Sequence, residues 1–246
     1  ILLIGDNCDS LGTLWDGKLI TDMYYSWTTS FYPAHHMSTG EGGMISSNDK
    51  DFIDKARSIS WWGRDCYCIG SNNLLPKGSC GNRFDNWLPG YDGIIDHKYI
   101  FSYMGYNLKP LDLQGAIGLA QLKKIDSFDK KRREHKIRLE KILLNYLDVK
   151  IAETLDKADP AWFGVPIIAN DQKQKEFLVS HFEQNKIQTR NYFAGNILLH
   201  PGYKHLDTAT NYPNANKALS HVFILGCPPF WNDKVFSYIE KVAALA

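Results

Sequence analysis

The sequence predicts an α/β fold, and three features indicate it. The chain opens with an unbroken apolar run, Ile1–Ile4, which is typical of a strand buried on both faces of a parallel sheet. Polar residues follow at once in Gly5–Asp9, and the carboxyl end of such a strand is where open α/β sheets bind ligands. Later strand-like stretches are followed by segments whose apolar residues recur at helical spacing.

The first 150 residues continue this alternation. We expect strands at 23–31 and 44–46, and helices at 51–62, 111–125 and 130–147. The charges of the helix at 130–147 are expected to form a solvated face. Residues 63–103 are irregular, and their aromatic side chains and cysteines argue against disorder. A loop of this length that is not disordered is usually functional.

The remaining residues, 151–246, indicate a small C-terminal α+β domain. We expect strands at 162–169 and 220–225, and helices at 174–184 and 233–245. The boundary is placed near residue 150, so that residues 1–150 are the C-terminal portion of a large domain. Because no methionine precedes the opening apolar run, we expect upstream sequence to supply the N-terminal part of that domain.

The composition excludes several classes of function. The 246 residues carry a formal net charge of +1, which gives no electrostatic reason to expect nucleic acid or an anionic membrane as a partner. No apolar run approaches the roughly 20 residues that a membrane helix needs. No charged segment followed by an apolar stretch opens the chain, so we expect a cytoplasmic protein.

Four of the five cysteines point to a metal. Cys66 and Cys68 form a close pair, Cys80 follows in the same irregular segment, and Cys8 lies far upstream. Such a set could bind zinc, hold a 2Fe–2S cluster or be structural. The spacing lacks the paired C-x-x-C of zinc ribbons, and disulfides are disfavoured without an export signal. Cys227 lies in an apolar stretch and is interpreted as an ordinary buried residue.

A second motif carries the strongest signal. Ser30–His36 reads Ser-Phe-Tyr-Pro-Ala-His-His, and Gly40–Gly43 follows as Gly-Glu-Gly-Gly. The segment resembles the signature of the sugar aminotransferases and dehydratases of the aspartate-aminotransferase (type I PLP) fold. In the aminotransferases a lysine stands two residues after the proline, where this sequence has His35. An imidazole cannot bind pyridoxal phosphate covalently as a primary amine does, but it can transfer protons near neutral pH.

The resemblance therefore implies a site that holds free pyridoxamine 5′-phosphate (PMP), as in the dehydratases of the group. Asp6 matches the aspartate that pairs with the pyridine nitrogen of the cofactor, and Ser30 matches the serine that binds its phosphate. Asn107 matches an asparagine that reaches the phosphate across a dimer interface, which implies a homodimer. One departure is Gly5, which stands where the family has glutamate.

The cysteines resemble one branch of this group, the CDP-6-deoxy-L-threo-D-glycero-4-hexulose 3-dehydratases, which use a 2Fe–2S cluster. That branch has a cysteine one residue before an active-site aspartate and a C-x-C pair 58 residues later, as Cys8, Asp9 and Cys66 are spaced here. The implied ligands are Cys8, Cys66, Cys68 and Cys80, the implied active-site tyrosine is Tyr32, and Phe193 matches the branch's Phe-Ala-Gly-Asn segment.

The resemblance also implies a reaction. The substrate would be a CDP-4-keto-6-deoxyhexose, with His35 removing a proton as the C3 hydroxyl leaves and Asp6 stabilising charge on the cofactor ring. Asp9 and Tyr32 would position groups or assist proton movement. The cluster would pass electrons from a flavin-containing, NADH-dependent reductase, and the product would lead to a 3,6-dideoxyhexose of a lipopolysaccharide O-antigen. The missing upstream segment would supply part of the phosphate cup, so we expect this chain alone to be inactive.

Two other interpretations stay open. One is the cluster-free branch of the dehydratases or a zinc-bound relative of it. The other is a non-catalytic dimerisation or zinc-binding module. An aminotransferase is disfavoured because no lysine occurs between Lys18 and Lys50. His36 could compete with His35 as the base, but the register of the motif favours His35, and His36 is interpreted as structural.

Overall fold

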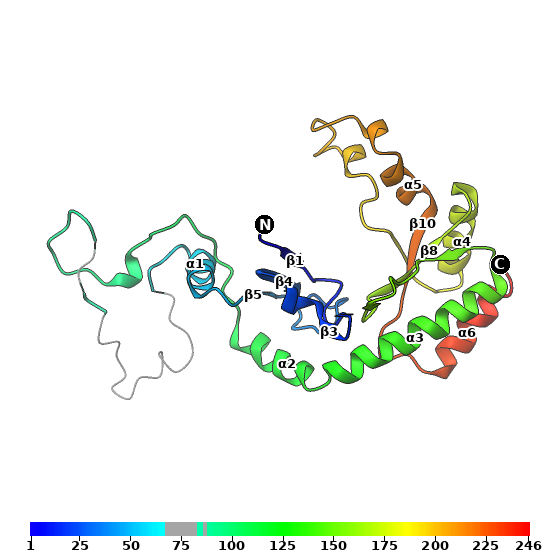
Figure 1. The fold of residues 1–246 in the computed structure, drawn as a ribbon, viewed down its shortest axis with the longest axis horizontal. Helices are drawn as coiled ribbons and strands as arrows, with labels where there is room; N and C mark the ends of the chain where they lie inside the picture. The colour runs from blue at the N-terminus through cyan, green and yellow to red at the C-terminus, as the bar shows by residue number, and fades with distance from the viewer. Residues whose placement is uncertain (67–82, 86–87) are drawn as a thin grey trace. The chain divides into compact units, whose positions relative to one another are not determined.

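The structure is a computed structural model that describes residues 1–66, 83–85 and 88–246 (Figure 1). The described chain forms two compact units, each assembled from several segments. Unit 1 comprises Ile1–Cys8, Met23–Pro33 and Ser38–Leu119, and unit 2 comprises Asp9–Asp22, Ala34–Met37 and Ala120–Ala246. The domain boundary placed near residue 150 stays a prediction.

Unit 1 is built on a three-stranded sheet. Its order is β1 (Ile4–Asp6), β4 (Ser26–Ser30) and β5 (Gly43–Ser47), with β1 parallel and β5 antiparallel to β4. The other regular elements described in this unit are the helix α1 (Lys50–Ser60), the short 3-10 helix η3 (His97–Tyr99) and most of α2 (Asp112–Leu122), whose last three residues belong to unit 2. The strands predicted at 23–31 and 44–46 and the helices predicted at 51–62 and 111–125 are confirmed.

Polar contacts define where α1 begins. The side chain of Asp49, the N-cap residue, accepts a hydrogen bond from the backbone N–H of Phe52 at 3.0 Å. The phenol of Tyr25 donates to the same carboxylate at 2.7 Å, which ties the helix start to the segment before β4. This hydrogen bond to Tyr25 and the N-cap contact lower the pKa of Asp49, so the carboxylate is charged at neutral pH.

The opening apolar run does not form the expected buried strand. β1 begins only at Ile4, and the side chains of Ile1–Ile4 are all more than half exposed. Within β1 only Gly5 is buried, and the strand lies at the edge of the three-stranded sheet. The prediction of a strand buried on both faces was therefore wrong, although the strand and its parallel pairing exist.

Unit 2 contains a four-stranded antiparallel sheet. Its order is β6 (Lys150–Ile151), β8 (Gly164–Ile168), β10 (Val222–Gly226) and β9 (Thr189–Asn191). Its helices are α3 (Ile125–Tyr146), α4 (Gln172–Gln184), α5 (Pro213–His221) and α6 (Asp233–Ala243), and the strands and helices predicted between 162 and 245 are confirmed. The smaller elements are β2 (Leu14–Trp15), β3 (Lys18–Leu19), β7 (Ala158–Asp159), η4 (Ile197–Leu199), η5 (Ala209–Asn211) and η1 (Ile20–Met23), whose last residue belongs to unit 1.

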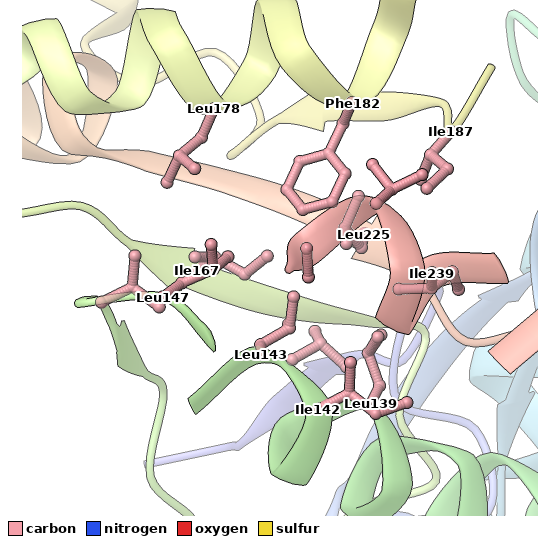
Figure 2. Packing of buried hydrophobic residues seen from close by; sticks show 14 of the residues in the cluster. Leu139, Ile142, Leu143, Leu147, Ile167, Leu178, Phe182, Ile187, Leu225 and Ile239 are labelled. Atoms are coloured by element: carbon pink, nitrogen blue, oxygen red, sulfur yellow. The ribbon is translucent and has the colours of Figure 1, made fainter. Parts of the chain in front are cut away.

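The core of unit 2 lies on one face of this sheet. Val165 pairs with Leu225 and Ile167 with Phe223, and because side chains alternate along strands, these four point to the same face. They join one buried apolar cluster with residues of α3, α4 and α6. Figure 2 shows side chains of α4 and α3 converging on this cluster, among them Phe182 and Leu143, which are both 0% exposed.

The face that α3 buries changes character along the helix. Its C-terminal half contributes Leu139, Ile142 and Leu143 to the core. Earlier residues of the helix bury charged side chains instead, namely Asp129, Arg132 and Lys136. The expectation that the charges at 130–147 form a solvated face was therefore wrong at Arg132 and Lys136. No helix of the described residues is both long enough and apolar enough to cross a membrane.

Candidate functional site

Two predicted cofactor residues of unit 1 lie at the carboxyl ends of neighbouring parallel strands. Asp6 is the last residue of β1 and is paired with Thr28 of β4, and Ser30 is the last residue of β4. The pairing continues one residue further, because the backbone N–H of Asn7 donates to Thr28 O at 2.8 Å. The sheet therefore presents a carboxylate and a hydroxyl at the edge where α/β sheets bind ligands.

The side chains of Asp6 and Ser30 suit the predicted partners, which are a pyridine nitrogen and a phosphate. Asp6 is exposed, and its Oδ1 accepts a hydrogen bond from the backbone N–H of Cys8 at 3.2 Å. Ser30 Oγ accepts from the backbone N–H of Tyr32 at 3.2 Å. An accepting hydroxyl keeps its own hydrogen for donation, so Ser30 can still bind a phosphate oxygen. Tyr32 itself is half exposed.

The departure at Gly5 has a steric reason. A Cβ atom at this buried position would lie 2.5 Å from Cε2 of Tyr24 and 2.7 Å from Nδ2 of Asn7. Contacts this close are not tolerated in packed protein. The aromatic ring of Tyr24 thus occupies space that a longer side chain at position 5 would need, so Tyr24 and Asn7 would have to move to admit one.

Unit 2 brings the predicted base and a carboxylate together. His35 Nδ1 lies 3.1 Å from Asp9 Oδ1, and both side chains are partly buried, with 16% and 30% exposed. The ring of His35 packs against Phe163, with ring centroids 5.4 Å apart. A carboxylate beside Nδ1 favours the tautomer that carries hydrogen on that atom, so that Nε2 is the nitrogen able to accept a proton. This arrangement suits an imidazole that acts as a general base.

The neighbouring His36 is placed differently. Its side chain is 3% exposed, and Nε2 donates to the backbone carbonyl of Ala161. Burial lowers the pKa of His36 to about 4, and the hydrogen bond to Ala161 only partly opposes this effect. His36 is therefore a neutral, buried residue at neutral pH, which agrees with its interpretation as a structural histidine.

The candidate metal ligands are only partly within the described residues. Cys8 and Cys66 are both partly exposed, whereas Cys68 and Cys80 lie outside the described residues. Within 1–66, 83–85 and 88–246, the structure contains no group of three or more His, Cys, Asp and Glu side chains that could hold a metal ion. The four-cysteine set therefore stays a prediction.

Cys227 is the buried residue that the sequence indicated. It is 0% exposed within the apolar cluster of unit 2, and its thiol donates to Trp162 O at 3.1 Å. Burial raises the pKa of this thiol to about 12, even though the cation of Arg132 opposes the shift. Such a thiol is protonated and a poor metal ligand.

Asn107 and Phe193 lie in irregular segments. Asn107 is exposed and forms an isolated β-bridge with Trp61 just after α1. Phe193 is 60% exposed and has a φ of +48°, a left-handed conformation that is unusual for a side chain of this size. Strained, exposed aromatic residues of this kind are more common at functional sites than elsewhere.

The rest of the Phe193 segment has a structural explanation. Asn196 is buried, caps η4 by accepting from Leu198 N at 3.0 Å, and donates to Ala209 O at 3.0 Å. A Cβ at Gly195, whose φ is +62°, would lie 2.5 Å from the Cβ of Leu219. The glycine and the asparagine thus shape the turn that displays Phe193.

Sequence reasoning missed a group of buried charges on α3. Arg132 donates to the backbone carbonyl of His35 at 3.2 Å, and Arg133 donates to that of Gly12 at 2.8 Å. Asp129, one turn earlier, is 8% exposed. The available signal was the spacing of 129, 132, 133 and 136 on one helical face, but the same spacing also occurs on solvated faces.

Comparison with known proteins shows which family this chain belongs to. The sequence model of the DegT/DnrJ/EryC1/StrS aminotransferase family matches residues 1–242. The chain belongs to this family. Its members with solved structures have the α/β type I PLP aminotransferase fold, which confirms the predicted fold class.

Two of the curated relatives are more than 30% identical to this chain. RfbH of Salmonella typhimurium, a lipopolysaccharide biosynthesis protein, is 34% identical over 243 residues, which are 96% of this chain and 54% of the relative. A dTDP-4-dehydro-2,6-dideoxy-D-glucose 3-dehydratase of Saccharopolyspora spinosa is 36% identical over 253 residues, with 99% of this chain and 53% of the relative covered. The chain therefore spans about half the length of these relatives.

Solved structures of the family give the same coverage. The GDP-4-keto-6-deoxy-D-mannose-3-dehydratase of E. coli with bound hydrated PLP has a TM-score of 0.78 and 23% identity, covering 99% of this chain and 60% of that structure. A sugar aminotransferase of Streptococcus pneumoniae in its PMP form has a TM-score of 0.80 and 16% identity, covering all of this chain and 58% of that structure. At these identities the likeness establishes the fold alone.

Proposed function

We propose that the protein containing this chain is a PMP-dependent 3-dehydratase of a nucleotide-linked 4-keto-6-deoxyhexose. The observation that supports this most is His35, which stands at the family's lysine position with the carboxylate of Asp9 3.1 Å from its Nδ1. An imidazole there removes the amine that an aminotransferase needs but provides a proton-transfer group. The 36% identical relative that is named as a nucleotide-sugar 3-dehydratase supports the same reaction.

Different residues of the chain would bind the cofactor and transfer the proton. Asp6 would pair with the pyridine nitrogen of the cofactor and Ser30 would bind its phosphate. When bound, PMP supplies an electron sink next to the ketone of the sugar. His35 Nε2 takes and returns a proton while Asp9 holds Nδ1–H and stabilises the imidazolium. Tyr32 and Phe193 would line the sugar site.

Replacement of the base tests this proposal. In the intact protein, His35→Asn should reduce dehydration by about 10²- to 10⁴-fold, because general base catalysis contributes about that much. Equilibrium dialysis should show unchanged PMP affinity. His205→Asn, which alters an exposed histidine, is the control and should retain full activity. Dehydration that persists in His35→Asn would reject His35 as the base.

We further propose that Cys8, Cys66, Cys68 and Cys80 hold a 2Fe–2S cluster that receives electrons from a flavin- and NADH-dependent reductase. The resemblance of the cysteine spacing to the CDP-hexulose branch supports this. Anaerobically purified intact protein should be coloured and contain iron, and Cys8→Ser should lose both, whereas the buried Cys227→Ala should keep both. Colourless, iron-free protein would favour the cluster-free branch, and bound zinc would favour a zinc-containing relative.

The nucleotide and the assembly follow from the same branch. We propose CDP as the nucleotide, a 3,6-dideoxyhexose for lipopolysaccharide as the end of the pathway, and a homodimer in which Asn107 reaches the cofactor phosphate of the other subunit. Comparing turnover of CDP-, dTDP- and GDP-linked 4-keto-6-deoxyhexoses tests the nucleotide, since the relatives differ in this respect. Analytical ultracentrifugation tests whether the protein is a dimer. Asn107→Ala should weaken PMP binding while the dimer stays intact.

A further inference from the structure

The buried charges on α3 need an explanation, because they are costly to bury. Arg132 is 3% exposed and Asp129 is 8% exposed, although charged side chains are rarely buried unless they are paired and hydrogen-bonded. Arg133 follows on the same turn of the helix, with 22% of its side chain exposed. What these side chains contact indicates why they are there.

Arg132 holds the backbone around His35. Its Nη2 donates to the carbonyl of His35 at 3.2 Å, and its Nη1 donates to the carbonyls of Trp162 at 3.2 Å and Phe163 at 3.4 Å. The ring of His35 packs on Phe163. A single planar guanidinium therefore fixes both the backbone of the proposed base and the residue that supports its ring.

Arg133 holds the segment that follows Asp9. Its Nη2 donates to the carbonyl of Gly12 at 2.8 Å and to that of Asp159 at 3.0 Å, and its Nε lies 2.8 Å from the carboxylate of Asp159. Gly12 is only three residues after Asp9 in the chain. The backbone next to Asp9 is thereby tied to α3.

Asp129 packs against the same segment. Gly12 has a φ of +77°, and a Cβ atom at this position would lie 1.9 Å from Oδ2 of Asp129. The Gly12 backbone thus approaches the carboxylate closely, and no side chain fits between them. Burial raises the pKa of Asp129 to about 6, and the charges of Arg133 and Arg132 oppose this shift only in part.

We propose that Arg132 and Arg133 are positioning residues that set the separation of Asp9 and His35. Asp9 lies in a turn and His35 in a bend, 26 positions apart in the chain, so neither has a helix or strand of its own to orient it. Arg132 and Arg133 are consecutive residues of α3 and hydrogen-bond the backbone of both segments. The helix therefore fixes the distance between these two sets of hydrogen bonds. This inference rests on the proposed function only in that it treats His35 as the base.

Chemical modification of His35 tests the proposal without relying on turnover. Diethyl pyrocarbonate acylates accessible, neutral imidazole, and mass spectrometry of the peptide that contains His35 gives its rate in the intact protein. Because the His35 side chain is only 16% exposed, release of its backbone in Arg132→Met should raise that rate severalfold. Arg132→Lys, which keeps the charge but can reach fewer carbonyls, should give an intermediate rate.

Arg138 supplies a matched control on the same helix. It is 44% exposed, and among the described residues it pairs with Asp233 and lies over the ring of Phe236, both far along the chain from the Asp9 and His35 segments. Arg138→Met should therefore leave the modification rate of His35 unchanged. Since Arg132→Met leaves Asp129 buried without this cation, the double variant Asp129→Asn/Arg132→Met provides a second protein in which both charges are removed together.

Kinetics provide the second readout. A displaced base lowers kcat more than it raises KM, and misplacement by about 1 Å can cost about 100-fold. Arg132→Met should therefore lower kcat for dehydration by about 10- to 100-fold with little change in KM, and Arg132→Lys should recover part of the loss. Arg133→Met should act in the same direction.

The outcomes separate the two proposals. If no nucleotide sugar is dehydrated but the modification rates follow the expected order, the proposed function fails and the positioning role of Arg132 stands. If wild-type protein is active and the rate for His35 is the same in wild type, Arg132→Met and the double variant, the positioning role is overturned. If Arg132→Met does not fold, Arg132→Lys and the double variant decide.

Discussion

The two units of the chain bury different kinds of residue. Unit 2 buries a large apolar cluster contributed by α3, α4, α6 and the four-stranded sheet, together with the charged side chains of α3. In the described part of unit 1 the buried side chains are mostly polar, including Asn7, Ser26, Thr29 and Ser58, and Ile100 is the single large apolar side chain that is buried. Many large apolar side chains of unit 1 lie at its surface instead, including Ile4, Met44, Ile45, Leu113 and Leu119.

This difference indicates that the units are stabilised differently. Burial of apolar surface contributes roughly 25 cal/mol per Å², so unit 2 can obtain most of its stability from its own core. Unit 1 relies more on strand pairing and on contacts such as the Asp49 cap, and each hydrogen bond contributes only about 1 kcal/mol net. Substitutions in the unit 2 core should therefore have the largest effects.

The largest expected effect is that of Phe182→Ala. Phe182 of α4 is 0% exposed in the cluster, and such truncations cost about 3–5 kcal/mol. Phe177→Ala on the same helix removes a ring that is 52% exposed and should cost less than about 1 kcal/mol. Urea unfolding monitored by circular dichroism measures both. Equal losses for the two variants would contradict the placement of the core.

A second prediction concerns two buried groups of unit 2, Asp129 and His36, whose pKa values are shifted in opposite directions. Burial raises the pKa of Asp129 from 3.8 to about 6, against the opposing effect of Arg133 and Arg132. The folded state therefore binds an extra proton, and Asp129 lowers stability as the pH rises from 4 to 6, by up to about 3 kcal/mol. Asp129→Asn should remove this loss, so its stability relative to wild type should increase over that range.

The contribution of His36 to stability changes with pH in the opposite direction. Burial lowers its pKa from 6.5 to about 4, so its contribution is present above pH 6.5 and is lost as the pH falls toward 4, by up to about 3 kcal/mol. His36→Gln should therefore lose less stability on acidification than wild type does. In the wild type the two effects partly cancel. Thermal melting of the three proteins between pH 4 and 7 checks this, and parallel curves would show that neither group titrates as described.

The sequence predicted the elements better than it predicted burial. Helical spacing of apolar residues located helices such as α1, and extended stretches located strands such as β4 and β8. It could not show that Arg132 is buried, because its acceptors include the carbonyl of His35, 97 positions away. The same limit holds for the site: the motif identified Asp9 and His35, but their 3.1 Å separation depends on contacts between distant segments.

The smallest expected effect compares two glycines in the unit 2 segment 9–22. Gly12 and Gly17 have nearly the same φ, +77° and +76°, but a Cβ at Gly17 would meet nothing within 4 Å. Gly17→Ala should therefore cost only the left-handed strain, about 1 kcal/mol. Gly12→Ala must also displace Asp129 and should cost about 1–3 kcal/mol more. If urea unfolding shows equal costs, the close approach of Asp129 to Gly12 is contradicted.

The segments that make up the two units have a consequence for how the protein can be cut and recombined. The chain leaves one unit for the other after Cys8, Asp22, Pro33, Met37 and Leu119. A protease that cleaves at any one of these junctions leaves the units joined by the others. By the same reasoning, a gene fusion with a single crossover cannot exchange one unit intact.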